Sequence, residues 1–213
     1  MYYGQKQLDR ILNEKYLSTV ENGTYIDAGA YDGVADSNTY FFYLNKGWTG
    51  YCLEPVPIIY KALTKYRSKD ITLNCALSND NEEKEFTQVI FSDYGLYEGQ
   101  SGNGSLNHVP SHITELENRK TATYEKFTTQ CMTLDKLYTD YKITTPITLL
   151  SLDVEGHEGI VLSRLPKITN ELHPKIIAVE YGHCGEEILD KTLLSLNYKK
   201  DFKDEINLIY IKG

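Results

Sequence analysis

The chain has 213 residues, of which 41% are hydrophobic, which is enough for one domain with a sizeable core. Its formal net charge is −8, with 30 Asp and Glu against 22 Lys and Arg, which excludes the broad basic surface that nucleic-acid binding requires. No apolar run approaches the ~20 residues of a membrane span, and the first residues lack the pattern of a signal peptide. We therefore expect a cytoplasmic protein with no membrane span and no nucleic-acid partner.

Hydrophobic periodicity predicts that helices and strands alternate along most of the chain. An amphipathic helix is expected within residues 1–20. The expected strands cover 24–27, 50–54, 71–75, 84–91, 124–131, 147–153, 175–180, 198–202 and 206–211, and the later expected helices cover 37–44, 57–66, 158–165 and 189–196. The Gly-, Ser- and Asn-rich segment that follows residue 91 breaks the alternation.

This order of elements predicts an α/β, Rossmann-like fold in a single domain over 1–213. The sheet is expected to be mainly parallel, with seven strands, helices on both faces and a C-terminal antiparallel hairpin. Residues 92–126 are expected to form an insertion loop and a candidate substrate lid, because long irregular segments in compact domains are usually functional or disordered.

The turn after the first expected strand has the composition of a cofactor loop. The run Tyr25–Gly33 contains a strand end, the acid Asp27, and Gly29 and Gly33 in a Gly-x-x-x-Gly pattern. A pyrophosphate needs amide N–H groups and a helix N-terminus, and Asp27 and Asp32 would repel it. S-adenosylmethionine carries an ammonium and a sulfonium but no phosphate, so these carboxylates favour it. Gly29 is expected to leave room for a close ligand.

A competing pattern keeps two alternatives open. The spacing Gly29-x-x-x-Gly33-x-Ala35 is similar to the glycine pattern of short-chain dehydrogenases, and Tyr138-x-x-x-Lys142 mimics their catalytic pair. The alternatives are therefore an NAD(P)-dependent short-chain-type reductase and a non-catalytic cofactor-binding domain. Glu54, at the end of the second expected strand, suits either cofactor, because a carboxylate there accepts hydrogen bonds from ribose hydroxyls.

Acidic residues also follow two later strands. Asp153, Glu155 and His157 alternate, so in an extended backbone their side chains would project the same way, and Glu180 ends the neighbouring strand. These four residues are the expected catalytic cluster, with Glu155 or His157 as the general base. Such acids can also hold a divalent cation through oxygen ligands. A histidine beside them favours metal-independent catalysis.

Three further histidines lie outside this cluster. His108, His112 and His183 are interpreted as surface or loop residues rather than metal ligands. The first two lie in the candidate lid and are in a position to touch substrate.

Several segments, in their order and spacing, resemble the FkbM methyltransferases from about Gln5 to Tyr181. They are GQKQLDRIL, YIDAGAYDGVADSNTY, GWTGYCLEPVPIIYKAL, NCALS, LLSLDVEGHEGIVLSRL and IIAVEYG. The resemblance implies a class I methyltransferase fold and S-adenosylmethionine as cofactor. The cofactor-binding residues that it implies are Asp27, Ala28, Gly29, Ala30, Tyr31, Asp32, Ser37, Asn38, Glu54, Pro55, Asn74, Cys75 and Ala76.

The resemblance also implies the acceptor. Members of this family mostly methylate hydroxyls, so we expect an O-methyltransferase that acts on a sugar, glycan or related small molecule. A glycosyltransferase is also an expected partner, either fused to the chain or acting with it.

Overall fold

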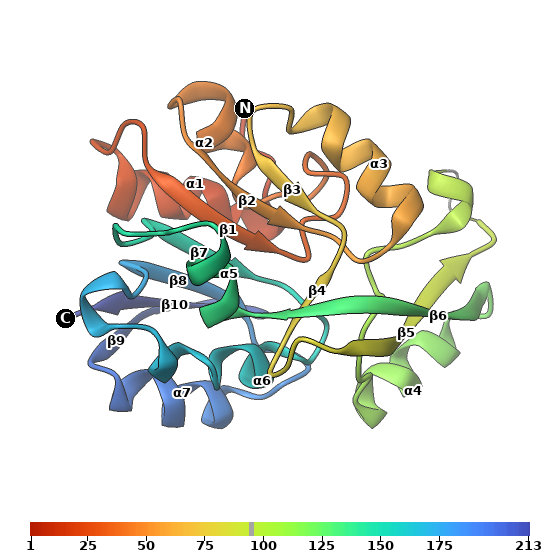
Figure 1. The fold of residues 1–213 in the computed structure, drawn as a ribbon. Helices are drawn as coiled ribbons and strands as arrows, with labels where there is room; N and C mark the ends of the chain where they lie inside the picture. The colour runs from red at the N-terminus through yellow and green to blue at the C-terminus, as the bar shows by residue number, and fades with distance from the viewer. Residues whose placement is uncertain (94–95) are drawn as a thin grey trace.

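The computed structural model describes residues 1–93 and 96–213, and its centre is a seven-stranded sheet (Figure 1). Residues 94–95, which belong to the predicted insertion loop, lie outside the described residues. Across the sheet the strands are β3 (Ile71–Leu73), β2 (Thr49–Leu53), β1 (Thr24–Ala28), β7 (Leu149–Leu152), β8 (Ile176–Glu180), β10 (Asn207–Lys212) and β9 (Tyr198–Lys203).

Strand directions agree with the prediction. β1 pairs in parallel with β2 on one side and with β7 on the other, and β7 pairs in parallel with β8. β10 is antiparallel to both β8 and β9, so the predicted C-terminal hairpin closes the sheet. The strand order reverses between β1 and β7, and ligands of open α/β sheets bind beyond the carboxyl ends of the strands at such a point.

Helices cover both faces of the sheet (Figure 1). On one face the core contains apolar residues of α1 (Leu8–Leu12), α2 (Tyr40–Asn45) and α3 (Pro57–Tyr66). On the other face it contains residues of α5 (Leu134–Asp140), α6 (Glu158–Leu162) and α7 (Glu186–Ser195).

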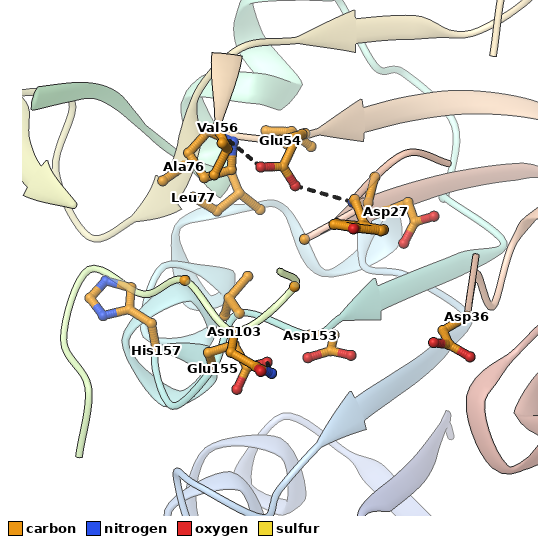
Figure 2. A pocket seen from close by; sticks show the side chains of 18 of the residues that line it. Asp27, Asp36, Glu54, Val56, Ala76, Leu77, Asn103, Asp153, Glu155 and His157 are labelled. Atoms are coloured by element: carbon orange, nitrogen blue, oxygen red, sulfur yellow. Dashed lines mark hydrogen bonds between the residues drawn. The ribbon is translucent and has the colours of Figure 1, made fainter. Parts of the chain in front are cut away.

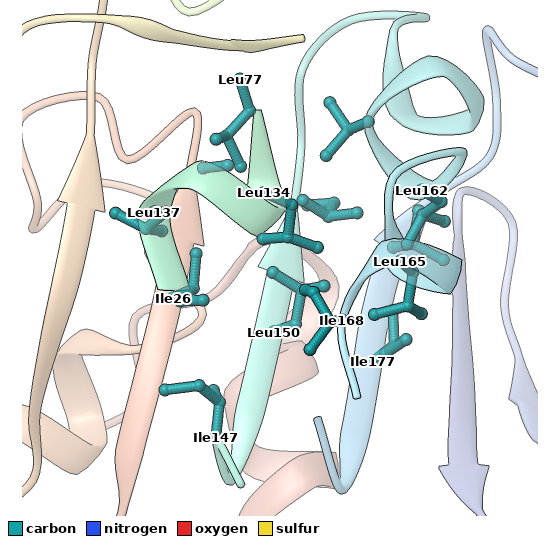
Figure 3. Packing of buried hydrophobic residues seen from close by; sticks show 14 of the residues in the cluster. Ile26, Leu77, Leu134, Leu137, Ile147, Leu150, Leu162, Leu165, Ile168 and Ile177 are labelled. Atoms are coloured by element: carbon teal, nitrogen blue, oxygen red, sulfur yellow. The ribbon is translucent and has the colours of Figure 1, made fainter. Parts of the chain in front are cut away.

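Alternate residues of one strand serve the two faces. Tyr25 is buried on the α1–α3 side and Ile26 on the other, because successive side chains of a strand point to opposite faces. Figure 3 shows the second cluster, in which Leu134 and Leu137 of α5 lie over Ile26 and Leu150.

A second, smaller sheet was not expected. β6 (Ala122–Thr133) pairs antiparallel with β5 (Glu83–Phe91) and in parallel with β4 (Ala76–Ser78). The predicted third strand, 71–75, is shorter in the structure, where it is β3, and β4 follows it as an unpredicted strand of the second sheet. The predicted insertion loop also differs from expectation, since it contains α4 (Pro110–Asn118) and the start of β6. This sheet and α4 lie beyond the carboxyl ends of β1 and β2 (Figure 1).

The N-terminal helix is shorter than expected. After a 3-10 turn at Gln5–Gln7, where Lys6 and Gln7 have positive φ, only α1 is α-helical, and a π-helical turn follows over Asn13–Leu17. Before the 3-10 turn, Tyr2 and Tyr3 instead pack against the rings of Phe41 and Tyr40 in α2. The carboxylate of the buried Asp9 also accepts a hydrogen bond of 2.6 Å from the Tyr3 N–H. Within the described residues, no helix is both long enough and apolar enough to cross a membrane.

Candidate active site

A cavity of about 220 Å³ lies beyond the carboxyl ends of β1, β2 and β7 (Figure 2). Residues of β5 and of the segment 101–106 form its other walls. Thirteen of the predicted site residues line it, namely Asp27, Gly29, Ala30, Tyr31, Ser37, Asn38, Glu54, Pro55, Cys75, Ala76, Asp153, Glu155 and His157. The lining does not include the predicted residues Ala28, Asp32, Asn74 and Glu180.

The turn after β1 is forced into its shape by a close backbone contact. Gly29 has a φ of 77°, and a Cβ added there would lie 1.7 Å from the carbonyl oxygen of Asp153. The expected reason for this glycine, room for a ligand, is therefore incomplete, because the neighbouring strand end fills that space. The Gly29 and Ala30 N–H groups donate to the carbonyl oxygen of Leu53, at 3.1 and 3.0 Å. The turn is thus fastened to β7 and β2 together.

Arg67, which follows α3, donates hydrogen bonds to the end of the same turn and to the residues after it. The sequence interpretation did not predict a role for this residue. Its guanidinium is fully buried and donates to the Gly33 carbonyl at 2.6 Å, to Thr39 Oγ1 at 2.6 Å and to Ser37 Oγ at 2.8 Å. It also lies 3.7 Å from the Asp27 carboxylate. Burial raises the pKa of Asp27, and the arginine opposes this shift.

Glu54, at the end of β2, is a buried carboxylate aimed at the cavity. Oε1 accepts a hydrogen bond from the Val56 N–H at 2.8 Å, and Oε2 accepts one from the Tyr31 N–H at 3.1 Å (Figure 2). Burial raises the pKa of Glu54 to about 7, although these two amides favour the charged form; the nearby Asp32 carboxylate raises the pKa further. Each oxygen keeps further acceptor capacity, which suits hydroxyl donors of a ligand.

The predicted residues outside the lining support the loops around it. Oδ1 of Asp32 accepts from the N–H groups of Val34 and Ala35, both at 2.8 Å, and Oδ2 accepts from the Tyr97 hydroxyl at 2.8 Å. The amide of Asn74 donates to the Glu54 carbonyl at 2.8 Å. Asp32 and Asn74 therefore shape the turns. Ala28 is buried within β1.

The acidic edge differs from the predicted arrangement, because β7 ends at Leu152 and the next residues do not continue as a strand. Glu155 has a φ of 55° and Gly156 a φ of 96°, so the side chains of Asp153, Glu155 and His157 diverge (Figure 2). Their expected projection in one direction is therefore wrong. Glu158 was not expected at the site; it is fully buried and holds this turn by accepting a hydrogen bond from the Val154 N–H at 2.9 Å.

Asp153 and Glu180 are buried near one another. Burial and the neighbouring carboxylates raise the pKa of both groups. Glu180 does not line the cavity. His157 lies elsewhere on the lining, where Nε2 is 3.1 Å from Ser78 Oγ. Burial lowers the pKa of His157 to about 4, which leaves a neutral imidazole.

The charged side chains that line the cavity are acidic. It contains the carboxylates of Asp27, Asp36, Glu54, Asp153 and Glu155, and among the described residues that line it none is Lys or Arg. Sequence reasoning did not place Asp36 there; its positive φ of 53° turns it toward the cavity, and no periodic pattern signals such a conformation.

Asn38 contributes an acceptor to this lining. Its Oδ1 is buried and has no hydrogen-bond partner among the described residues. A buried acceptor of this kind is costly unless a ligand donates to it. The cavity therefore presents acceptors and negative charge.

The strand order and the position of the cavity define the Rossmann-like fold of the class I methyltransferases, as predicted. The chain belongs to the methyltransferase FkbM domain family, whose model matches residues 27–204. No curated protein matches the chain.

A solved structure with a TM-score above 0.5 supports this fold. Methyltransferase FkbM from Methylobacillus flagellatus KT is 14% identical with a TM-score of 0.55; the match covers 93% of this chain and 47% of that one, so the present chain spans about half of that protein. A TehB-like SAM-dependent methyltransferase from Corynebacterium glutamicum ATCC 13032 Kitasato is 7% identical, with a TM-score of 0.46 and coverage of 97% and 87%.

Proposed function

We propose that the protein is an S-adenosylmethionine-dependent O-methyltransferase that uses this cavity for cofactor and acceptor. The observation that carries the proposal is the cavity lining at the β1–β7 switch point, which contains five acidic side chains and, among the described residues, no Lys or Arg. A cofactor with an ammonium and a sulfonium gains from such a lining, whereas a pyrophosphate would meet carboxylates in place of cations. Family membership supports the same choice.

The residues present fit this cofactor. Asp27 and the unpartnered Oδ1 of Asn38 offer acceptors for an ammonium group, and Glu54 offers two carboxylate oxygens to the ribose hydroxyls. Cys75 and Ala76 supply an apolar surface beside Glu54 for the adenine. When bound, the cofactor supplies an electrophilic methyl group on its sulfonium. The protein must exclude water and hold acceptor and cofactor in line.

The positions of Tyr138 and Lys142 disfavour the reductase alternative. Tyr138 lies within α5 and is buried in the core, while Lys142 is exposed after the helix, and neither residue lines the cavity. A tyrosine in that position has no route to a substrate held at the ends of β1 and β7.

The acceptor that we propose is a hydroxyl of a sugar, a glycan or a related small molecule, as the family resemblance implies. Residues 101–104 of the predicted lid reach the cavity, and Asn103 donates a hydrogen bond of 3.2 Å to Glu155 Oε1. We therefore assign the acceptor to the side of the cavity formed by Asn103, Glu155 and His157, opposite Glu54 (Figure 2).

Proton removal falls to Glu155 or His157. Both line the cavity, and a base must lie within hydrogen-bond reach of the acceptor hydroxyl. Asp153 keeps a role in orienting the site. His157 has the stronger claim, because its buried Nδ1 has no hydrogen-bond partner among the described residues, whereas both oxygens of Glu155 lie against other side chains.

The experiment is a methyl-transfer screen with S-[methyl-³H]adenosylmethionine and panels of glycans, monosaccharides, phenols and small hydroxylated compounds. The expected result is label in a hydroxyl acceptor as an alkali-stable ether. Label found only on an amine, carboxylate or thiol acceptor would overturn the O-methyl assignment. Binding of the cofactor with no transfer to any acceptor would favour the non-catalytic alternative.

A further inference from the structure

Two histidines and a glutamate from three distant parts of the chain meet behind the cavity wall. His112 belongs to α4, Glu155 follows β7, and His183 lies between β8 and α7. Nδ1 of His112 is 3.5 Å and Nε2 of His183 is 3.4 Å from the same oxygen, Oε2 of Glu155. The three donor atoms all lie within 4.8 Å of one another.

The two N···O spacings, 3.5 and 3.4 Å, are those of ligands around one ion. In a tetrahedral site with bonds of ~2.0–2.1 Å, neighbouring donor atoms lie about 3.3–3.4 Å apart. The imidazole rings of His112 and His183 are stacked, with centroids 3.8 Å apart and planes 13° apart, so both rings present an edge nitrogen to the carboxylate.

A ring nitrogen of His112 is available for ligation. His112 is buried, and its Nδ1 has no hydrogen-bond partner among the described residues. A buried polar atom of this kind is costly unless a ligand or an ion satisfies it.

The local backbone is built to deliver the carboxylate. The positive φ of Glu155, followed by Gly156, turns its side chain out of the line of β7, and a Cβ on Gly156 would meet His183 Cβ at 3.4 Å. Asn103 holds the other oxygen of Glu155, and Ser105 Oγ donates to the Glu155 carbonyl at 2.9 Å. Supporting hydrogen bonds of this kind orient metal ligands in proteins.

We propose that His112, Glu155 and His183 form a binding site for a first-row divalent transition metal, with Zn²⁺ as the best match. Two imidazole nitrogens and one carboxylate leave at least one coordination position open, as in catalytic zinc sites. Mg²⁺ and Ca²⁺ prefer all-oxygen ligands, so the set disfavours them. The site differs from the cation site that the acids at 153, 155 and 180 suggested.

The proposed metal site does not depend on the proposed function, but its position bears on which residue acts as the general base. Glu155 lines the cavity, whereas His112 and His183 do not, so the cation lies at the cavity wall and ties α4 to the main sheet. With Glu155 acting as a metal ligand, His157 is the remaining candidate for the general base.

The test uses untagged full-length protein, stripped with EDTA, dialysed and then titrated with Zn²⁺, Co²⁺, Mn²⁺ or Mg²⁺. We expect a single equivalent of Zn²⁺ to remain after gel filtration, Co²⁺ to give visible d–d absorption, and Zn²⁺ to raise the Tm. His112→Gln, His183→Gln and Glu155→Gln should each weaken binding by more than the ~10–100-fold that the loss of an outer partner costs.

The matched control is His108→Ala. The His108 ring lies 5.0 Å from that of His112 but supplies no donor to the cluster, so this variant should keep its Zn²⁺. Circular dichroism checks that each variant folds, and His183→Gln, at a partly exposed position, guards against loss of the fold. Less than about 0.1 equivalents of bound metal, or equal Co²⁺ spectra in wild type and His183→Gln, would overturn the site. Preference for Mg²⁺ over Zn²⁺ would overturn the assigned class of cation.

Discussion

Cofactor affinity should depend on pH through the carboxyl group of Glu54. Its pKa of about 7 without ligand reflects burial, opposed by the N–H groups of Tyr31 and Val56 and reinforced by the Asp32 carboxylate. Ribose hydroxyls donate to the ionised form, so cofactor binding must release a proton from Glu54 wherever that carboxyl is still protonated. Affinity should therefore rise with pH up to about 7 and then level off.

The size of the effect follows from the shift. With a pKa of about 7, about 3% of Glu54 is ionised at pH 5.5 and about 90% at pH 8. If only the ionised form binds, affinity falls ~30-fold between these values, which corresponds to about 2 kcal/mol. A carboxyl with the ordinary value of 4.5 would give almost no change over this range.

The assay is calorimetric titration with S-adenosylhomocysteine at pH 5.5, 6.5, 7.5 and 8, for wild type and Glu54→Gln. The variant should bind more weakly at pH 8, by roughly 1–3 kcal/mol, and should lose the steep pH dependence. Other cavity carboxylates are common to both proteins, so the difference isolates Glu54. Parallel pH profiles for the two proteins would refute the reasoning.

Four further substitutions test other parts of the site. Gly29→Ala should lower the free energy of unfolding in urea by about 3 kcal/mol or more, because the residue has a positive φ and the added Cβ would meet a carbonyl oxygen. The control is Gly102→Ala, which has nothing within 4 Å of its Cβ and should change stability by less than about 0.5 kcal/mol. Arg67→Leu leaves buried carboxylates without their cation and should cost about 3–5 kcal/mol; a loss below about 1 kcal/mol would show that the guanidinium does not anchor the turn. His157→Asn should lower kcat by ~10²–10⁴-fold with an unchanged Kd for S-adenosylhomocysteine, and a wild-type kcat would remove it as the base. Asn103→Ala should likewise reduce methyl transfer without weakening cofactor binding, and the opposite pattern would place Asn103 at the cofactor.

Periodicity was sufficient for the main sheet. Alternation of apolar residues located the seven strands, and the hairpin of β9 and β10 followed from two short strands with a charged turn. Periodicity did not predict the second sheet, because its strand pairing depends on tertiary contacts. The strand β4 was not predicted, because it pairs with β6, far away in sequence, and local propensity carries no information on that partner.

The site shows the same limit. Asp27 and Glu54 were predictable because the carboxyl ends of neighbouring parallel strands meet at one edge. Arg67 was not, since its partners Gly33, Ser37 and Thr39 lie far from it in the sequence.

The proposed metal ligands could not be predicted from the sequence for a related reason. The positive φ of Glu155 sends its side chain away from Asp153, and that turn brings it to His112 and His183. Only the folded chain shows that conformation.

The central claim is that the cavity at the ends of β1, β2 and β7 binds S-adenosylmethionine with its reactive end toward the acceptor side. A crystal structure with S-adenosylhomocysteine tests it most directly. We expect both ribose hydroxyls within hydrogen-bond distance of Glu54, the amino group at Asp27 and Asn38, and the sulfur facing the side of Glu155 and His157. A ligand bound elsewhere, or a ribose with no contact to Glu54, would contradict it.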